Sequence, residues 1–262
     1  MINSLCDVIL PDSHVPYHDP TALECALKVI EYLKPRKVIL LGDGIDCTAW
    51  ARHAPKMLKQ DKTSYVDTDI KPMNMILDRI QDSARELVYI SGNHEDWVEK
   101  WAANNAPHGI GSAIVSKLAP SVLLSRKSNG RARRRFQWIP YNTYLPHYKV
   151  APNLWAVHGW SFAKNAASVH LEKARTFSVI YGHSHRADYA SSLLMEDDTM
   201  IEAWSDGCLA SLKPAYMMHS PHNWSHGLSV IYHSRKNPYD WTRVQVRIKK
   251  GRAILGDGTQ IG

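Results

Sequence analysis

Short apolar runs alternate with amphipathic stretches in the first third of the chain. Residues 5–10, 37–43 and 87–93 are rich in Val, Ile and Leu, and each run ends in polar residues or leads into a polar loop, which is typical of buried strands. Between them, apolar residues recur at helical spacing over 20–33 and 70–84, and Asp19 followed by Pro20 marks a helix start. This βαβαβ order predicts a largely parallel sheet, with functional side chains at the carboxyl ends of its strands.

The rest of the chain changes character. Residues 97–118 follow a helical pattern that breaks at the GIG of 110–112, and residues 154–159 and 177–185 read as two further strands that end in histidines. Residues 189–194, 199–204, 227–233 and 242–248 read as antiparallel strands joined by turns. No repeat or linker forces a boundary, so we expect one domain over residues 1–262, with a basic, partly helical insertion near 97–150.

Side chains with oxygen or imidazole nitrogen donors follow five of the predicted strands. Each group has an ordinary interpretation as a cap, a turn or a satisfied histidine, but their repeated occurrence after apolar runs is what those interpretations leave unexplained. Oxygen and imidazole donors suit Mn²⁺, Fe²⁺, Zn²⁺ or Ni²⁺, and two neighbouring cations need a bridging carboxylate. The groups are Asp12 with His14, Asp43 with Asp46, Asn93 to Glu95, His158, and His183 with His185.

In this order the motifs D-x-H, GDxxD, GNHE, H and GHxH resemble those of the calcineurin-like metallophosphoesterase superfamily, over residues 12–185. The resemblance implies an α/β fold, a four-layer α/β/β/α sandwich with two mixed β-sheets, whose second sheet includes the strands around Asp206. It also implies two divalent metal ions, Mn²⁺ before Mg²⁺, Fe²⁺, Zn²⁺ or Ni²⁺. By the resemblance, one metal would be bound by Asp12, His14, Asp43 and His185, and the other by Asp43, Asn93, His158 and His183.

The same resemblance implies hydrolysis of a phosphoester. A hydroxide bridging both metals would attack phosphorus, and His94 would protonate the leaving oxygen or stabilise its charge. Asp46 would orient a ligand or that histidine, and Glu95 would support the turn. Ser91 and Cys47 stand where phosphoprotein phosphatases of the superfamily carry arginines that grip a phosphomonoester, which argues against a phosphatase of that type.

The net charge of +7 is unevenly distributed. From Lys100 to Leu171 the chain has no Asp or Glu in 72 residues but carries ten Lys and Arg. An exposed basic loop of this kind attracts a polyanion, although a solvated loop without a fixed ligand is the plainer alternative. Six of the ten charges fall within residues 126–135 and are candidate nucleic-acid contacts: Arg126, Lys127, Arg131, Arg133, Arg134 and Arg135.

Charge and motifs together favour a nuclease, a phosphodiesterase acting on nucleic acid, with DNA favoured over RNA as the partner. One alternative is a phosphatase or phosphodiesterase acting on nucleotides or other small phosphoesters. Another is a binding or scaffold protein that has lost catalysis. The chain has no long apolar stretch and no N-terminal signal, so we expect a cytoplasmic protein without membrane contact, whose protein partners stay open. Its four cysteines are far apart and are expected to be reduced and buried.

Overall fold

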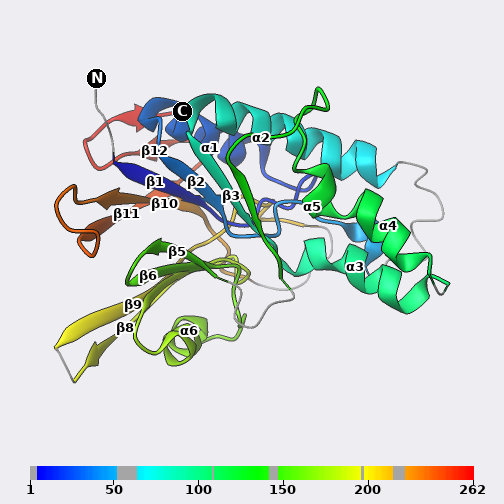
Figure 1. The fold of residues 1–262 in the computed structure, drawn as a ribbon. Helices are drawn as coiled ribbons and strands as arrows, with labels where there is room; N and C mark the ends of the chain where they lie inside the picture. Colours follow the sequence, from blue (N-terminus) through cyan, green and yellow to red (C-terminus); the bar gives the residue numbers. More distant parts are fainter. Residues whose placement is uncertain (1–4, 52–63, 108, 142–146, 196–197, 215–221) are drawn as a thin grey trace.

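Two large sheets form the body of the protein in a computed structural model that describes residues 5–51, 64–107, 109–141, 147–195, 198–214 and 222–262 (Figure 1). The six-stranded sheet has the order β11-β10-β1-β2-β3-β4, and its strands β1 to β4 are parallel. These strands are β1 (Cys6–Leu10), β2 (Lys37–Leu40), β3 (Glu86–Ile90), β4 (Phe136–Ile139), β10 (His226–His233) and β11 (Trp241–Ile248).

The second sheet has five strands in the order β5-β6-β7-β9-β8, and it is also mixed. A short hairpin of β12 (Ala253–Ile254) and β13 (Gln260–Ile261) stands apart from both sheets. The five strands are β5 (Tyr148–Ala151), β6 (Leu154–Val157), β7 (Ser178–Tyr181), β8 (Ala187–Leu194) and β9 (Thr199–Asp206).

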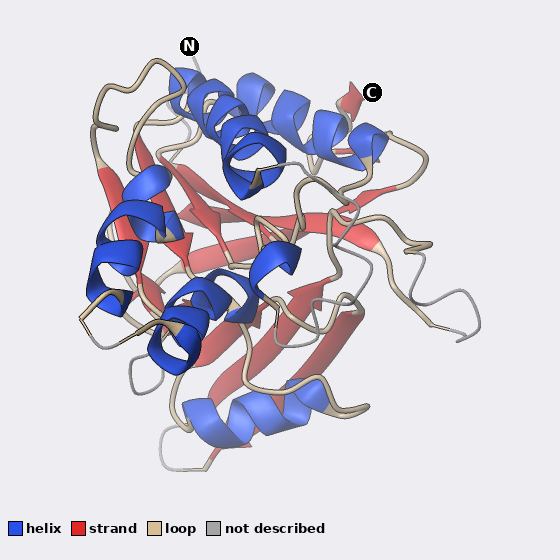
Figure 2. Cartoon of the chain, turned by 90° about the vertical axis from the view of Figure 1, so that its right-hand side faces the viewer, coloured by secondary structure: helices blue, strands red, loops and turns tan. Residues whose placement is uncertain are grey.

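Helices cover the outer faces of both sheets (Figure 2). Helices α1 (Pro20–Leu33) and α2 (Lys71–Ser83), the latter preceded by a π-helical turn at Val66–Ile70, pack on the six-stranded sheet. Helix α6 (Ala166–Ala174) packs on the five-stranded sheet. Beside these layers lie a 3-10 turn at Thr48–Trp50 and the helices α3 (Asn93–Asn105), α4 (Gly111–Leu118) and α5 (Pro120–Leu123).

The side chains of the central strands alternate between two cores, which explains their continuous apolar sequences. In β1, Val8 and Leu10 pack with the helices α1 and α2, whereas Ile9 faces the second sheet. Both faces are therefore buried, as expected of strands covered on two sides. The layers run helix, sheet, sheet, helix, so the predicted four-layer α/β/β/α sandwich is confirmed.

Several element predictions need correction. The helix predicted from residue 97 begins four residues earlier as α3, because Glu95 caps its own first turn. Strands β10 and β11 were expected to belong to the second sheet. They extend the six-stranded sheet instead, where β10 pairs with β1. Helix α6 was not predicted. The segment near 97–150 supplies β4 and β5 to the sheets in addition to α3 to α5.

Two global expectations can be compared with the structure. The four cysteines are free thiols and all are buried, as predicted. Within the described residues, none of the helices combines the length and the apolar character needed to cross a bilayer.

A buried carboxylate at the start of β1 leads to a prediction about acid stability. Asp7 is fully buried and accepts hydrogen bonds from Arg36, at 3.0 and 2.7 Å, and from His233 at 2.9 Å. Burial by itself would raise the pKa of Asp7, but His233 and Arg36 outweigh it and hold the pKa below its ordinary 3.8. A depressed pKa contributes stability above the unfolded-state value, and this contribution is lost as the pH falls through the folded-state value.

We therefore expect Asp7→Asn to lower the free energy of unfolding at pH 7 by about 2 kcal/mol, the usual cost of losing hydrogen bonds to a charged group. The difference between variant and wild type should shrink below about pH 4, because protonation removes the same charge from the wild type. Urea unfolding at several pH values measures both. A difference that stayed constant down to the acid transition would contradict this role.

Candidate metal centre

The predicted donors converge where the strands of both sheets end. Asp12 and His14 follow β1, Asp43 and Asp46 follow β2, and Asn93 opens α3 directly after β3. The histidines come from the second sheet, where His158 follows β6, and His183 and His185 follow β7. Because β1, β2 and β3 are parallel, their carboxyl ends meet at one edge, as the sequence predicted.

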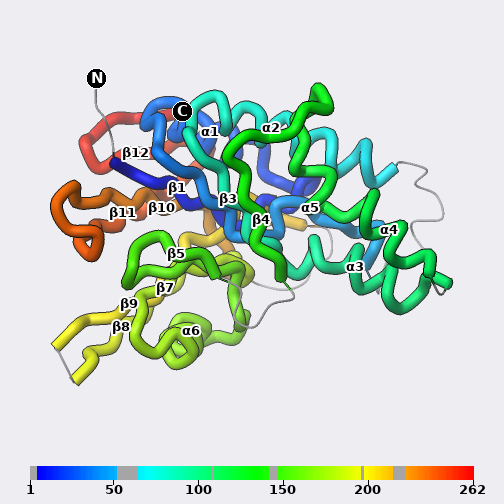
Figure 3. The backbone as a smooth tube through the Cα atoms, viewed as in Figure 1, coloured from blue at the N-terminus to red at the C-terminus, as the bar shows by residue number. Residues whose placement is uncertain are grey.

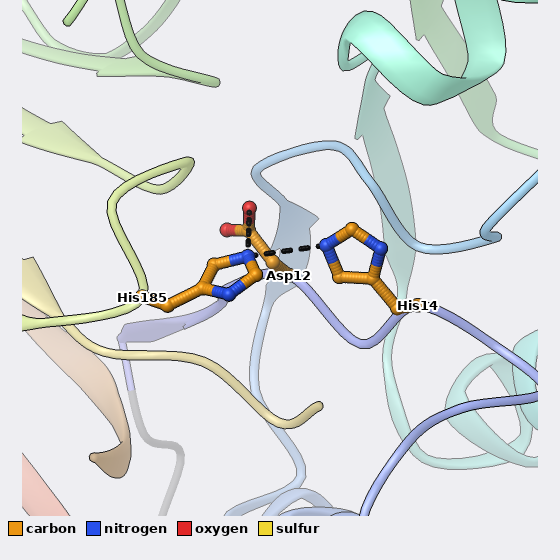
Figure 4. A group of neighbouring side chains, drawn as sticks. All are labelled: Asp12, His14 and His185. Atoms are coloured by element: carbon orange, nitrogen blue, oxygen red, sulfur yellow. Dashed lines mark hydrogen bonds and ion pairs between the residues drawn. The ribbon is translucent and has the colours of Figure 1, made fainter. Parts of the chain in front are cut away.

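One group of donors consists of Asp12, His14 and His185, which point toward one another (Figure 4). His14 Nε2 and His185 Nε2 are 3.1 Å apart, and His185 Nε2 is 3.3 Å from Asp12 Oδ2. His14 Nδ1 lies 2.9 Å from Asp46 Oδ1, so this ring donates its Nδ1 proton to the carboxylate and keeps a lone pair on Nε2. Asp46 is therefore in contact with a predicted ligand, where the expected orienting role would place it.

A second group contains Asp43, His158 and His183. His158 Nε2 lies 3.4 Å from Asp43 Oδ2 and 2.9 Å from Asn93 Oδ1. Asp43 Oδ2 is also 3.8 Å from His14 Nε2, so this carboxylate faces both groups. All seven predicted ligands therefore lie at one centre, and Asp43 occupies the position expected of a bridge.

The residues present fit divalent cations. His158 Nδ1 lies 2.9 Å from the carbonyl oxygen of Leu41, an acceptor only, so Nδ1 carries a proton. The opposite nitrogen faces the oxygens of Asn93 and Asp43, a contact that requires positive charge between them, either a proton or a metal ion. Oxygen and imidazole donors of this kind bind Mn²⁺, Fe²⁺, Zn²⁺ and related ions.

The local charges set the protonation of the donors. Burial opposes ionisation of Asp43, but His158 and His94 hold its pKa well below the usual value. Burial, with His158 nearby, lowers the pKa of His183 to about 4. Burial also acts to lower the pKa of His158, yet Asp43 and Asp12 raise it to about 9. Two donors are thus ready to bind a cation, and at His158 a cation would replace a proton.

Two glycines bring the backbone close to the predicted carboxylate ligands. A Cβ atom on Gly92 would lie 2.1 Å from Asp43 Oδ1, and one on Gly182 would lie 2.2 Å from Asp12 Oδ1. Any side chain at either position would displace a carboxylate. Four of the predicted ligands also adopt left-handed backbone conformations, which concentrate at functional sites because the surrounding contacts enforce them. They are His14, Asp43, His183 and His185.

His94 was not predicted as a metal ligand, but it adjoins the centre, and with His14 and Asp43 it forms a third group of donors close enough to hold a metal ion. Its Nδ1 lies 2.6 Å from the carbonyl oxygen of Asp46, and its Nε2 lies 3.8 Å from Asp43 Oδ2. The ring stacks on Trp97 with centroids 3.9 Å apart. Burial works against the charged form, but Asp43 and Asp46 raise the pKa of His94 overall. Nε2 is therefore the nitrogen that faces the centre.

Glu95 joins the loops that carry these residues. It is almost fully buried, and it accepts hydrogen bonds from the backbone of Asp43 at 3.0 Å, of Ile45 at 3.2 Å and of Gly92 at 2.7 Å. The hydroxyl of Tyr89 donates a fourth bond at 2.7 Å. Glu95 thus braces the loop after β2 against the start of α3, which matches the supporting role expected for it.

The basic loop does not lie at this centre. Arg135 directly precedes β4, and its carbonyl accepts a bond from the backbone N–H of Leu87, near the start of β3. Since β3 and β4 are parallel, the loop lies at the amino ends of the strands and the donors lie at the carboxyl ends (Figure 3). The length of the strands therefore separates the centre from five of the candidate contacts: Arg126, Lys127, Arg131, Arg134 and Arg135.

Arg133 is a correction to the predicted nucleic-acid contacts. Its side chain is buried, and its guanidinium bonds Asp78 at 2.6 Å, Asn74 Oδ1 at 2.9 Å and the carbonyl of Leu124 at 2.8 Å. A guanidinium with these partners is not available to a phosphate. The residue was misassigned because the carboxylate that binds it lies 55 positions away in the sequence.

Four aromatic residues surround the centre. The sequence suggests Trp97 and Tyr141 as residues that could stack on bases, but it gives no role to Trp224 or Phe162. Besides Trp97, the ring of Trp224 contacts His185 at 4.3 Å, and Tyr141 lies 6.1 Å from His158. Phe162 is 73% exposed and touches His183 with ring centroids 5.6 Å apart, so it offers a free apolar surface at the mouth of the centre. Aromatic content alone does not distinguish such positions from core packing.

Comparison with known proteins gives a limited result. No protein-family model matches the chain, and no curated protein matches it. The similar solved structures include Chaetomium thermophilum Vps29, at 9% identity over 99% of this chain and 94% of that one, with a TM-score of 0.48. They also include Pseudomonas putida nuclease MPE, at 12% identity over 86% and 84% with a TM-score of 0.36. Yfce, a phosphoesterase from E. coli, matches at 11% identity over 98% and 97% with a TM-score of 0.37.

The layer order and the two mixed sheets are those implied by the resemblance to the calcineurin-like metallophosphoesterase superfamily. The five motifs that carry that resemblance meet at one point in the fold, where their donors form adjoining groups.

Proposed function

We propose that this protein is a metal-dependent phosphoesterase that hydrolyses phosphodiester bonds, with nucleic acid as its substrate. The observation that supports the chemistry is the pair of donor groups that Asp43 faces, one containing it and the other 3.8 Å away at His14, with His94 facing the same space. Asp12, His14 and His185 would hold one divalent cation with Asp43, and Asn93, His158 and His183 the other. When bound, the cations supply charge to the phosphoryl oxygens and lower the pKa of the attacking water.

His94 would assist departure of the leaving group. Its Nδ1 proton is committed to the carbonyl of Asp46, so the proton that it can donate is the one on Nε2. Nearby carboxylates favour the charged imidazolium that such a donor needs, and loss of the Nε2 proton leaves a neutral ring with its Nδ1 bond intact. The leaving alkoxide would depart as an alcohol.

The surroundings favour a diester over a monoester. Cys47 is fully buried, where burial and the nearby acidic groups raise its pKa well above the usual value, and Ser91 is also buried. Neither position supplies the cation that grips a doubly charged phosphate. Among the described residues, the ion pairs of Asp12, Asp43 and Asp46 are all with histidines. A singly charged diester places a smaller demand on such a site.

Nucleic acid is favoured as the diester by two surfaces. The exposed ring of Phe162 at the centre could stack on a base, and the exposed cations before β4 could hold a phosphate backbone. One observation favours the alternative, a small phosphoester. Those cations are remote from the centre, so the centre could act on a small substrate without any contribution from them. A scaffold role is disfavoured because a complete ligand set serves no purpose in it.

An activity panel tests the proposal. With Mn²⁺ present, we expect cleavage of single- or double-stranded DNA or of RNA, together with slower turnover of a chromogenic diester. A phosphopeptide and a chromogenic monoester should react poorly, because among the described residues the carboxylates of the centre pair with histidines and not with an arginine. Cleavage of the phosphopeptide alone would refute the proposal. Turnover of small esters without any action on polynucleotides would favour the alternative, and no turnover with any divalent metal would favour the scaffold.

A further inference from the structure

Five cationic side chains surround one cleft at the end of the sheet remote from the metal centre. Arg85 comes from the link between α2 and β3, and the others come from the loop before β4: Lys127, Arg131, Arg134 and Arg135. The cleft has a volume of about 500 Å³, and no Asp or Glu is among the described residues that line it. Like charges held this close repel one another, so the cleft favours an anionic occupant.

The loop that carries these cations is fixed by its own contacts. Arg133 anchors it from beneath, with bonds to Asp78 and to the carbonyl of Asn74 at 2.9 Å. Asp78 also accepts bonds from the backbone and hydroxyl of Ser128, so its charge is already satisfied. The backbone N–H of Lys127 donates to the carbonyl of Arg131 at 2.7 Å. The cations are therefore in position before a ligand arrives, which lowers the entropic cost of binding.

Strand β4 leads from this cleft to the metal centre. It is the edge strand of the six-stranded sheet and begins directly after Arg135. Just beyond its other end, the ring of Tyr141 lies 6.1 Å from His158, and Lys100 sits over the same ring at 5.5 Å. At the rise of an extended chain, residues 135 to 141 span roughly 20 Å. Lys100 is paired with Asp96 at 2.6 Å, so an anionic chain along this edge would be held mainly by the cations of the cleft.

We propose that the basic cleft is a separate anion-binding site that holds the phosphate backbone of a nucleic-acid duplex roughly 20 Å from the bond to be cleaved. This inference rests on the proposed function. At 3.4 Å per base pair the separation corresponds to about six base pairs. The cations contact phosphates and read no bases, so the site adds affinity without sequence preference. It also gives the enzyme a length requirement, because only substrates that reach the cleft benefit from it.

Binding is tested with a triple variant, Arg131→Gln with Arg134→Gln and Arg135→Gln. The matched control is Lys28→Gln with Lys34→Gln and Lys236→Gln, which removes the same charge from exposed positions away from β4. Binding is measured with a metal chelator present, so that no cleavage occurs. At 0.1 M salt we expect the cleft variant to bind a duplex of about 20 base pairs at least about tenfold more weakly than the wild type does. The slope of log affinity against log salt should fall by about 2 to 3. The control should change affinity less than about twofold, and thermal melting verifies that both variants are folded.

Turnover separates this inference from the proposed function. The cleft variant should show a raised KM for long duplexes, with kcat and the turnover of a chromogenic diester unchanged. The effect should vanish when fewer than about six base pairs extend from the cleaved bond toward the cleft.

If the cleft variant binds and cleaves long duplexes like the control, the cleft inference is wrong and the nuclease proposal stands. If the wild type binds duplexes through the cleft but cleaves none, the nuclease proposal fails and the cleft stands. Tighter binding of inorganic polyphosphate than of nucleic acid would overturn the assigned ligand. Loss of duplex binding in Arg247→Gln with Lys249→Gln and Arg252→Gln, rather than in the cleft variant, would place the nucleic acid at the β11 edge and overturn the site.

Discussion

Replacement of Asp43 by Asn is expected to abolish metal-dependent hydrolysis, lowering kcat/KM by at least about a thousandfold. The carboxylate faces both donor groups, with Asp43 Oδ2 3.8 Å from His14 Nε2 and 3.4 Å from His158 Nε2. A neutral amide cannot offset the repulsion between two cations. Metal ions in such sites supply several kcal/mol of transition-state stabilisation, and about 4 kcal/mol corresponds to a thousandfold in rate.

Asn is the suitable replacement because Asp43 has a left-handed backbone, with φ at 46°, which Asn tolerates. Metal content per chain, measured after dialysis against Mn²⁺, should fall below two ions. The control is Asp198→Asn, the same exchange at an exposed residue with φ at 55°, which should change neither quantity. If Asp43→Asn bound two ions and retained turnover, Asp43 would not be the bridge.

Replacement of His94 by Ala is expected to lower kcat by about 100- to 10,000-fold, the usual contribution of a general acid, while metal content stays unchanged. The ring faces the centre through Nε2, and its other contacts are to the carbonyl of Asp46, to Trp97 and, edge-on with centroids 4.5 Å apart, to the ring of His14. His94 is not itself a predicted ligand, so its removal leaves the predicted ligands in place. This separates His94 from the histidines predicted to bind metal, whose loss should lower metal content as well.

The leaving group supplies an internal control for this variant. A nitrophenolate departs without a proton, whereas the alkoxide of a nucleic acid needs one, so the variant should lose less activity on the chromogenic diester than on DNA. Equal losses on both substrates would show that His94 acts through charge or position alone. Normal turnover on both, or loss of bound metal, would contradict its proposed role.

The centre could be predicted because its information is local. Each donor follows an apolar run that forms a strand, and parallel strands bring their carboxyl ends together, so the convergence of Asp12 and Asp43 follows from pattern alone. The start of α3 at Asn93 was missed because the helix signal there is Glu95, which bonds the backbone of Gly92 at 2.7 Å. A Gly followed three residues later by Glu resembles a capping box and could have revealed it.

The role of the basic segment could not be predicted from the sequence, because the exposure of its side chains and its position in the fold depend on residues far away in the chain. Whether Arg133 faces solvent is decided by Asp78 on α2, and a run of arginines does not show which one is anchored. The position of the loop depends on residues 136–139 joining the sheet parallel to β3, although FQWI gives only a weak strand signal. Composition could predict the charge, but only the topology shows at which end of the sheet it lies.

The centre also joins the two sheets, which meet elsewhere through an apolar core and through polar contacts such as those of Asp206 on β9 with Ser229 on β10 and Arg243 on β11. Asp12, His14, Asp43 and Asn93 belong to loops of the six-stranded sheet, whereas His158, His183 and His185 belong to loops of the other. Bound ions would link the two sheets. A ligand that binds only the folded chain raises the free energy of unfolding in proportion to the logarithm of the ligand concentration. The resistance of this protein to unfolding would therefore follow the supply of divalent cations, and metal starvation would deplete the folded protein as well as its activity.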